Sequence, residues 1–444
     1  MCKLEEFVIK ALPAELWEET LENEESTIRT RIFPWALVTW LLIWQRLSKG
    51  ASLGATLSAI KVGVFRGAFK LSGAKEERIS GRTGGYSQAR NRLPLKVVEI
   101  SVDKIHEQIR ELHKKQKWEG YRVYLVDGST ITLPHTKELI KRYPPSTNQS
   151  GKSHWPKLNI CCAHDLITGV AIRPEYGAMY GKEAVSEVAL FKEMLGRMET
   201  GSIIVADRAY GIFTVAQASI NQGSEVVVRL TDDRAKRFLS SMKEPGVIQV
   251  NWSPSTGELK KYPEIDKQAL VSGYFIWHRL EKKGFKTIDL YLFTTLKQDI
   301  RKTVELYGLR WNVENDLRDM KHCLNLEEVS AKSPEMIHKE IILAYAAYNL
   351  VRHVISIAAG IHKIAPRRVS FKRVVDLVTF GGTNMLSASF KEQNEFIDKF
   401  IELIPDITNN VRKRPPQVRK KLYKREKFPP LKNRQKEQKK LLLH

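Results

Sequence analysis

The chain has 444 residues, of which 42% are hydrophobic and 28% are charged, and its 73 Lys and Arg against 50 Asp and Glu give a formal net charge of +23. This length suits two or three domains with sizeable cores, which excludes a peptide module and a wholly disordered chain. The basic excess predicts a polyanionic partner, nucleic acid first and an anionic membrane surface second, because clustered Lys and Arg displace condensed counterions.

The cysteines and the N-terminus indicate a protein of a reducing compartment. Neither a CxxC pair nor a disulfide framework is present, so the thiols are expected to be buried or incidental, and no structural zinc is implied. The cysteines are Cys2, Cys161, Cys162 and Cys323. The first segment lacks the basic-then-apolar order of a signal peptide. The most apolar stretch, residues 32–44, is shorter than the about 20 residues of a spanning helix, which predicts a buried helix of a soluble domain.

The first 117 residues show helical periodicity, and the pattern changes to strands at residue 121. Residues 121–127 form a β-branched and aromatic run that stops at Asp127, before a Gly-Ser-Thr turn. Residues 157–164 predict a second strand with residues 169–173 as its hairpin partner, residues 184–198 an amphipathic helix, and residues 201–207 a strand that ends on Asp207. This order predicts a mixed α/β sheet.

Short β-like runs separated by Pro and Gly fill residues 223–295 and predict a small β-rich subdomain inserted before the next helix. One helix is expected over residues 300–325, and a second from the Ser333 N-cap to about residue 359. A C-terminal helical region is expected over residues 366–410. Residues 411–444 hold 14 Lys and Arg against two Glu, which predicts a tail that is disordered alone and ordered on a polyanion, or one that only aids solubility.

The residues that indicate a functional site are a set of acidic and basic side chains. A carboxylate at the end of a core strand projects where ligands bind, although acids also end strands by capping turns. On the helix after the insertion, Tyr307, Arg310, Glu314 and Lys321 fall on one narrow stripe at about 100° per residue, and Arg318 extends it. The stripe is either a solvated face with ion pairs or a site where a carboxylate holds a metal and cations hold phosphates.

Tyr307-(2)-Arg310-(3)-Glu314-(6)-Lys321 reproduces the Y-(2)-R-(3)-E-(6)-K signature of insertion-sequence transposases with a DDE triad, so the chain resembles the insertion-sequence-four type of this family. Asp127-Gly-Ser-Thr resembles the family's first-aspartate block, and the residues from Val205 to Tyr210 resemble its second. The resemblance covers roughly residues 85–352.

The resemblance implies a ribonuclease-H-like core over residues 118–222 and 296–365, a mixed five-stranded sheet with helices on both faces. The insertion of residues 223–295 would interrupt this core, since Asp207 and Glu314 are 107 residues apart. The resemblance also implies that Asp127, Asp207 and Glu314 are catalytic ligands of two Mg²⁺ or Mn²⁺ ions, with Asp127 bridging both. Mg²⁺ prefers carboxylates and water, so no His or Cys ligand is required.

The resemblance further implies a DNA transposase that cleaves and transfers strands, by cut-and-paste, in the cytoplasm at the bacterial nucleoid. Its partners would be double-stranded DNA, namely the terminal inverted repeats of its own element and the target DNA, and no membrane. The helical domain of residues 1–117 would recognise the repeats, and cleavage of two ends implies a homodimer on DNA. A metal-dependent nuclease on the same core and a domesticated, non-catalytic DNA-binding protein are the rivals.

Several residues are candidates for DNA contact. Arg310 can bind a phosphate bidentately, Lys321 as a point charge and Tyr307 through one hydrogen bond. Arg208 is a further phosphate candidate, unless it pairs with a neighbouring acid. A basic and aromatic cluster in a loop suits stacking and phosphate contact, and its members are Lys152, His154, Trp155 and Lys157. In the helical domain, Arg90 and Arg92 are either DNA contacts or capping and ion-pair residues.

Two expectations concern aromatic and apolar side chains. Some family members hold a flipped base with an aromatic residue of the insertion. Candidates for this role, which more often belong to a core, are Trp252, Trp277, Tyr291 and Phe293. The apolar face of the helix after Ser333 is either core or a dimer interface.

Overall fold

The computed structural model describes residues 32–63, 75, 78–148, 151–281, 287–297, 299–385 and 390–409. Cys2 and the basic tail expected over residues 411–444 lie outside the described residues. The other three cysteines, Cys161, Cys162 and Cys323, are buried and free, as expected.

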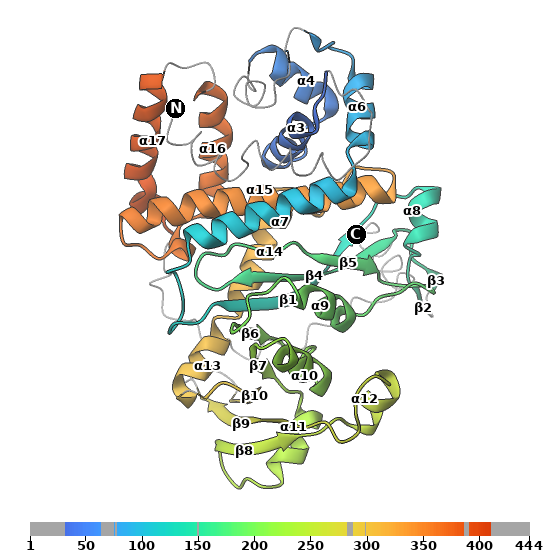
Figure 1. Ribbon diagram of the computed structural model, residues 1–444, viewed down its shortest axis with the longest axis vertical. Helices are drawn as coiled ribbons and strands as arrows, with labels where there is room; N and C mark the ends of the chain where they lie inside the picture. The colour runs from blue at the N-terminus through green and yellow to red at the C-terminus, as the bar shows by residue number, and fades with distance from the viewer. Residues whose placement is uncertain are drawn as a thin grey trace, which may run out of the picture.

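A mixed eight-stranded sheet forms the centre of the protein, in the order β5-β4-β1-β6-β7-β10-β9-β8 (Figure 1). Its strands are β1 (Val123–Thr132), β4 (Lys157–Asp165), β5 (Glu175–Ala178), β6 (Ile203–Ala206), β7 (Glu225–Arg229), β8 (Gly246–Trp252), β9 (Val271–Leu280) and β10 (Ile288–Thr294). β1 is antiparallel to β4 and parallel to β6, and β6 is parallel to β7. The order β5-β4-β1-β6-β7 fits the mixed five-stranded sheet expected of a ribonuclease-H-like core.

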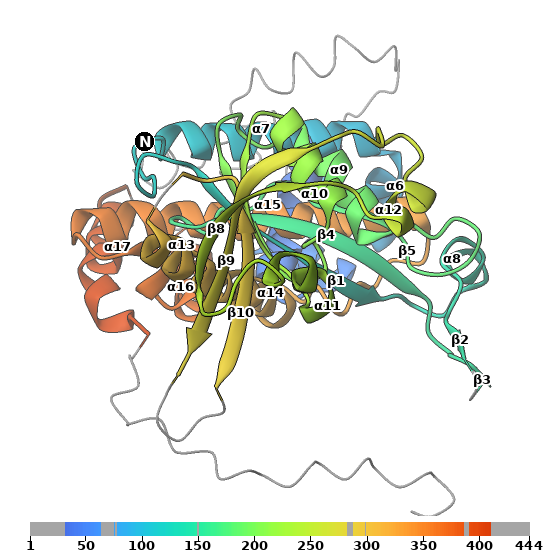
Figure 2. The ribbon, with the colours of Figure 1, turned by 90° about the horizontal axis from the view of Figure 1, so that it is seen from below.

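The expected insertion differs from a separate subdomain in two respects. β7, inside the expected range of residues 223–295, is hydrogen-bonded to β6 as part of the core sheet. The following strands β8, β9 and β10 then extend this same sheet with antiparallel pairing, since β10 pairs with β7. Figure 2 shows β9 and β10 as long strands that run out from the body of the protein. Periodicity predicts that these segments are strands. It cannot predict which of them pairs with the free edge of β7, because unpaired backbone groups at a sheet edge can accept any strand.

Helices cover both faces of the sheet, because side chains alternate along each strand. Val123 and Leu125 of β1 face the core shared with the large helical layer, whereas Tyr124 and Val126 face the smaller helices of the opposite side. The smaller helices are α9 (Glu187–Leu195), α10 (Phe213–Asn221), α11 (Asp232–Leu239) and α12 (Thr256–Lys261). The mixed α/β class predicted from the sequence is therefore observed.

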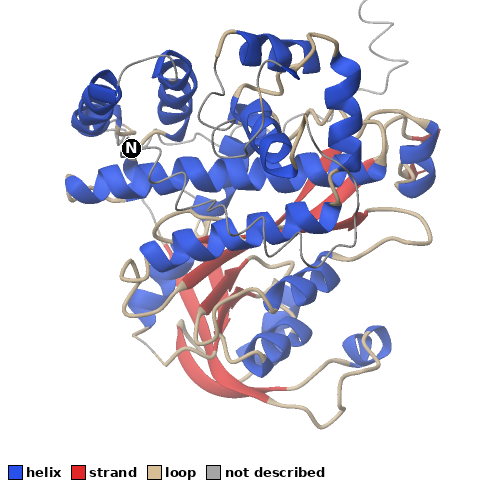
Figure 3. Ribbon diagram, turned by 45° about the horizontal axis from the view of Figure 1, so that its top comes forward, coloured by secondary structure: helices blue, strands red, loops and turns tan. Residues whose placement is uncertain are grey.

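The large helical layer covers one side of the sheet (Figure 3), and it joins the N-terminal and C-terminal parts of the chain (Figure 1). Its helices are α3 (Trp35–Leu47), α4 (Leu53–Lys61), α6 (Thr83–Arg92), α7 (Leu95–Leu112), α13 (Ile300–Gly308), α14 (Trp311–Cys323), α15 (Pro334–Ile361), α16 (Phe371–Met385) and α17 (Phe390–Leu403). Short elements complete the described chain, namely α8 (Lys137–Arg142), β2 (Thr147–Asn148), β3 (Gly151–Lys152), and the 3-10 turns Pro366–Arg368 and Ile404–Ile407. α15 packs against both α3 and α7, so it is the spine of the layer.

α15 is the one helix among the described ranges that is long and apolar enough to cross a membrane, but 89% of its apolar window is buried inside the protein. Ile337, Ile341, Tyr345, Tyr348 and Val351 are all buried. The core interpretation of this helix is confirmed, and its apolar face is not available as a dimer interface.

Two local predictions were wrong, and a third was correct only in part. β1 continues to Thr132 instead of ending at Asp127, because β4 supplies a partner for every residue of the Gly-Ser-Thr segment. The hairpin partner expected at residues 169–173 is present only in part. These residues turn back along the end of β4, where the Asp165 N–H donates to the Val170 carbonyl, the Ile172 N–H donates to the Ala163 carbonyl and Ala171 bridges His164, whereas the longer antiparallel partner of β4 is β5. The helix expected over residues 300–325 is divided into α13 and α14 by a tight turn at Leu309 and Arg310.

Candidate active site

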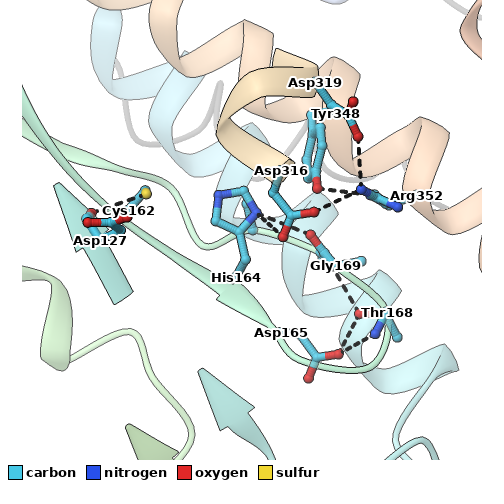
Figure 4. A network of polar contacts seen from close by, with 12 residues as sticks. Asp127, Cys162, His164, Asp165, Thr168, Gly169, Asp316, Asp319, Tyr348 and Arg352 are labelled. Atoms are coloured by element: carbon cyan, nitrogen blue, oxygen red, sulfur yellow. Dashed lines mark hydrogen bonds and ion pairs between the residues drawn. The ribbon is translucent and has the colours of Figure 1, made fainter. Parts of the chain in front are cut away.

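Asp127 lies in the middle of β1, where the sheet opens. The pairing of β1 with β6 stops at Val126 and Ala206, whereas its pairing with β4 continues to Thr132. Asp127 is therefore the first residue of β1 with a free edge on the β6 side. The backbone N–H of Gly128 donates to Asp127 Oδ1 at 2.9 Å, and the thiol of Cys162 donates to the Asp127 carbonyl at 3.2 Å (Figure 4).

Asp207 follows the last residue of β6 and opens a fixed loop. The N–H of Ala209 donates to Asp207 Oδ1 at 2.7 Å. Arg234 of α11 donates to the carbonyls of Arg208 and Gly211 at 2.7 and 3.2 Å. At Gly211 a Cβ would lie 2.0 Å from the carbonyl oxygen of Arg229, so only glycine lets the loop pass this close to the end of β7.

Glu314 lies one turn into α14, and Arg310 connects it to Asp127. The Arg310 guanidinium donates to Glu314 Oε1 at 2.7 Å and lies 3.5 Å from Asp127 Oδ2. Arg310 is 8% exposed, whereas the Glu314 side chain is 38% exposed. The turn between α13 and α14 thus places a buried cation between two carboxylates.

The negative charges of Asp127, Asp207 and Glu314 repel one another in a partly buried environment. Burial raises the pKa of Asp127 to about 6, and the negative charges of Asp207 and Glu314 add to this shift against the attraction of Arg310. Both other acids therefore act electrostatically on Asp127. One nearby guanidinium does not compensate three carboxylates, and a further cation would stabilise the ionised form of Asp127.

A second network of polar contacts holds α14 against α15 and the sheet (Figure 4). Asp316 is fully buried and accepts from Arg352 of α15 at 2.8 Å and from Arg367 at 2.9 Å. His164 of β4 lies 3.5 Å from its carboxylate. Burial alone would raise the pKa of Asp316, but Arg367 and Arg352 lower it. These bonds join α14 to α15 and the sheet only two residues from Glu314.

The donor set at the opening suits a hard divalent cation, since it is made of carboxylate oxygens. In this structure the Arg310 guanidinium takes the cationic place between Asp127 and Glu314. As the side chains stand, the described part of the chain holds no group of three or more His, Cys, Asp or Glu close enough together to share a metal ion. The chemistry of the donors and their uncompensated charge fit a metal, with Arg310 as the present counter-charge.

Comparison with known proteins gives a match over the same region. The family model described as a transposase DDE domain matches residues 118–350, which is more than half of the chain. The chain belongs to the DDE transposase family. It is therefore a DDE transposase enzyme, in agreement with the resemblance carried by the Y-(2)-R-(3)-E-(6)-K residues.

The transposase is also similar to individual proteins. It is 20% identical over 367 residues to the transposase InsG for insertion sequence element IS4 of Escherichia coli (strain K12), over 80% of this chain and 78% of that protein. A structural comparison finds piggyBac transposase in a synaptic complex with hairpin DNA, with a TM-score of 0.42, 11% identity, and coverage of 94% of this chain and 86% of that one.

The signature residues of the transposase occupy different environments. Tyr307 is 9% exposed and packs into the core, and burial raises its pKa. Lys321 is half-buried and lies 3.0 Å from Glu327 rather than at the carboxylates. Arg318 and Arg208 are both exposed. The expected stripe on one helix is therefore interrupted by the turn between α13 and α14, where the side chain of Arg310 is buried.

The basic and aromatic cluster lies away from the three acids. Lys157 pairs with Thr132, five residues along β1 from Asp127, or about 17 Å at 3.4 Å per residue. His154 stacks on His135 with ring centroids 3.9 Å apart, and Trp155 is 49% exposed. The backbone of Lys152 ends β3, and its side chain lies outside the described residues.

The two candidates of the helical domain differ in their surroundings. Arg90 lies 3.0 Å from Glu340, whose side chain is 1% exposed and also contacts Arg46 at 3.2 Å. The ion-pair interpretation of Arg90 therefore replaces the DNA contact, and it ties α3 and α6 to α15. Arg92 is exposed and donates to Gln88.

Of the four aromatic candidates in the expected insertion, two are buried and two are half-buried. Trp252 and Phe293 are buried and contact each other, so both belong to the core. Trp277 is half-buried and donates its indole N–H to Asp289, beside the half-buried Tyr291.

Two residues near the acids were missed. Trp311 is 63% exposed at the start of α14, and the Arg310 guanidinium lies 5.4 Å from its ring centre. An exposed tryptophan directly after a signature arginine was the available signal. Glu187 lies against Gly128, and burial together with the charge of Asp207 raises its pKa. Nothing in its local sequence distinguishes it from an ordinary acid in the first turn of a helix.

Proposed function

We propose that this transposase binds the terminal inverted repeats of its own insertion sequence and cleaves and transfers DNA strands by cut-and-paste. Asp127, Asp207 and Glu314 would hold two Mg²⁺ or Mn²⁺ ions at the opening between β1 and β6, in a ribonuclease-H-like core. The observation that carries the proposal is the arrangement of carboxylates around one guanidinium. Arg310 lies between Asp127 and Glu314, and the charges of Asp207 and Glu314 also act on the buried Asp127.

The cations, when bound, activate the attacking oxygen and neutralise the leaving oxygen of the phosphodiester. The chain supplies the geometry. The strand pairing of β1 fixes Asp127, the clamped loop fixes Asp207, and the network around Asp316 fixes the helix that carries Glu314. These three supports lie on different elements, so the three acids would come to one site only in the folded protein.

Cations near the opening would hold the DNA. Arg310 can donate two parallel hydrogen bonds to a phosphate once a metal ion balances the carboxylates. Lys321, Arg318 and Arg208 would supply further positive charge for binding the DNA backbone. Trp311 offers an exposed ring for stacking on a base. Lys152, Trp155 and Lys157 would contact DNA farther from the cleaved bond.

The working complex would be a homodimer, since two element ends must be cut together, and it would act in the cytoplasm at the nucleoid. The described surface of α15 does not provide the interface, because the apolar face of that helix is buried.

The test is Mg²⁺-dependent cleavage of a duplex that carries the DNA flanking this gene. We expect cutting at the element ends by the natural chain, a loss of about 10³-fold in Glu314→Gln, and no cutting without metal. Glu305→Gln is the matched control, because Glu305 is an exposed acid of the neighbouring helix α13. Joining of the cut end to a second duplex would distinguish a transposase reaction from that of a nuclease.

Two results would contradict the proposal. Undiminished cutting by Glu314→Gln would show that Glu314 is not a catalytic ligand. Specific binding of the element ends without any cutting by the natural chain would instead indicate a domesticated DNA-binding protein.

A further inference from the structure

Glu187 is a carboxylate at the opening that neither the DDE motif nor the signature includes. It is the first residue of α9, which follows the Ser186 N-cap and packs against β4 and β5 (Figure 1). Its side chain is only half-buried. Among the described residues no hydrogen bond or ion pair reaches the Glu187 carboxylate, whereas Glu175 and Glu264 pair with Arg197 and Lys192.

The carboxylate of Glu187 lies directly against the backbone of the residue that follows Asp127. A Cβ placed on Gly128 would be 2.6 Å from Glu187 Cδ and 2.7 and 2.9 Å from its two oxygens. The absence of a side chain at Gly128 therefore creates the space that Glu187 occupies. Gly128 lies just beyond Val126, the last residue of β1 that pairs with β6, so the carboxylate is at the opening of the sheet.

The charge of Asp207 also acts on Glu187. A half-buried, unpaired acid is thus held beside one proposed metal ligand and against the backbone next to another. Without a cation this arrangement is repulsive, and the nearby Arg310 is already engaged by Asp127 and Glu314. An acid placed only to favour the N-terminus of α9 would not need a glycine opposite it.

We propose that Glu187 is a positioning residue of the metal site, whose carboxylate accepts hydrogen bonds from water molecules held by the cations at Asp127 and Asp207. The inference rests on the proposed function. Mg²⁺ keeps several of its waters in proteins, and outer carboxylates that orient such ligands affect metal affinity by about 10- to 100-fold. Gly128 of the Asp-Gly-Ser-Thr block would have the matching role of leaving room for this carboxylate.

The experiment is a calorimetric titration of the full-length protein with Mn²⁺, without DNA. We expect Glu187→Gln to raise the Mn²⁺ dissociation constant by about tenfold. Gly128→Ala should do the same, because the added methyl group displaces the flexible end of Glu187 and leaves the backbone in place. Glu193→Gln, an exposed acid farther along α9, is the matched control and should bind Mn²⁺ like the natural chain. The melting temperature without metal should not fall in Glu187→Gln, since a repelled charge is removed.

The possible results separate the two proposals. Unchanged Mn²⁺ affinity in Glu187→Gln, with binding abolished in Asp127→Asn, would overturn the role of Glu187 and leave the proposed function intact. A lower melting temperature with unchanged Mn²⁺ affinity would identify Glu187 as a helix-terminus residue only and would likewise overturn the inference. Failure of the natural chain to bind Mn²⁺ would instead contradict the metal site itself.

Discussion

Two acids of α14, Glu314 and Asp316, show two opposite uses of a carboxylate. Asp316 is fully buried between Arg352, Arg367 and His164, and the arginines lower its pKa despite its burial. Two residues earlier, Glu314 belongs to a group in which the pKa of Asp127 is raised to about 6. Asp316 and its cationic partners, the complete group, balance their charge within the protein. Asp127, Asp207 and Glu314, the incomplete group, do not.

This difference separates structural acids from acids that await a ligand. A buried carboxylate that stabilises a fold needs enough cationic and hydrogen-bonding partners to offset its loss of hydration. Asp316 has them, and it joins α14 to α15 and the sheet. Within the described ranges Arg310 is the cation that pairs with Asp127 and Glu314, so a bound cation would complete the charge balance of the three acids.

The largest effect on folding is expected at the complete group. Asp316→Asn should lower the free energy of unfolding by about 3–5 kcal/mol, because the buried Arg352 and the half-buried Arg367 lose their charged partner. Urea denaturation followed by circular dichroism measures the change. Glu327→Gln, which removes an exposed partner of Lys321, is the control and should cost less than about 1 kcal/mol. Equal stability of the Asp316→Asn protein and the natural chain would show that the network does not anchor α14.

A smaller effect of opposite sign is expected at the incomplete group. The folded protein holds a proton on Asp127 up to about pH 6, whereas the unfolded chain releases it near the ordinary value of 3.8. The folded state therefore binds more protons between these values, and its stability falls as pH rises through this window. Asp127→Asn should be more stable than the natural chain above pH 6, by on the order of 1 kcal/mol, and the difference should vanish below about pH 4. Metal-free thermal melts across this range test it, and a destabilised variant at pH 7 would contradict it.

The smallest effect on stability is expected at Lys321, whose ion pair with Glu327 is at the surface. Lys321→Met should change the free energy of unfolding by less than about 0.5 kcal/mol. It should nevertheless weaken DNA binding and reduce the slope of log affinity against log salt by about 1, as expected for one lost phosphate contact. Fluorescence anisotropy at several salt concentrations measures this slope. An unchanged slope would place Lys321 outside the DNA interface.

The sequence predicts the elements of this fold better than their connections. The strands that lead to Asp127 and Asp207 and the long helix after Ser333 follow from local periodicity, because alternation and capping are local properties. The extension of β1 through Gly128 and the attachment of β10 to β7 depend on which strand supplies the partner, which local patterns do not encode.

The site shows the same limit. The signature identifies Arg310 and Glu314 as neighbours on the chain, but the contact of Arg310 with Asp127 arises from the turn between α13 and α14. Arg90 had the composition of a DNA contact, and only the fold brings it to Glu340 across 250 residues. Glu187 could not be found from the sequence, because its relation to Gly128 is a contact between a helix and a strand.

The most direct test of the account is the anomalous scattering of Mn²⁺ in crystals of the protein grown with this ion. The account predicts anomalous peaks at the opening between β1 and β6, with Asp127, Asp207 and Glu314 as ligands and Arg310 moved away from Asp127. Crystals that bind Mn²⁺ only elsewhere, with Arg310 still between Asp127 and Glu314, would contradict the claim that the incomplete charge of this group serves a metal.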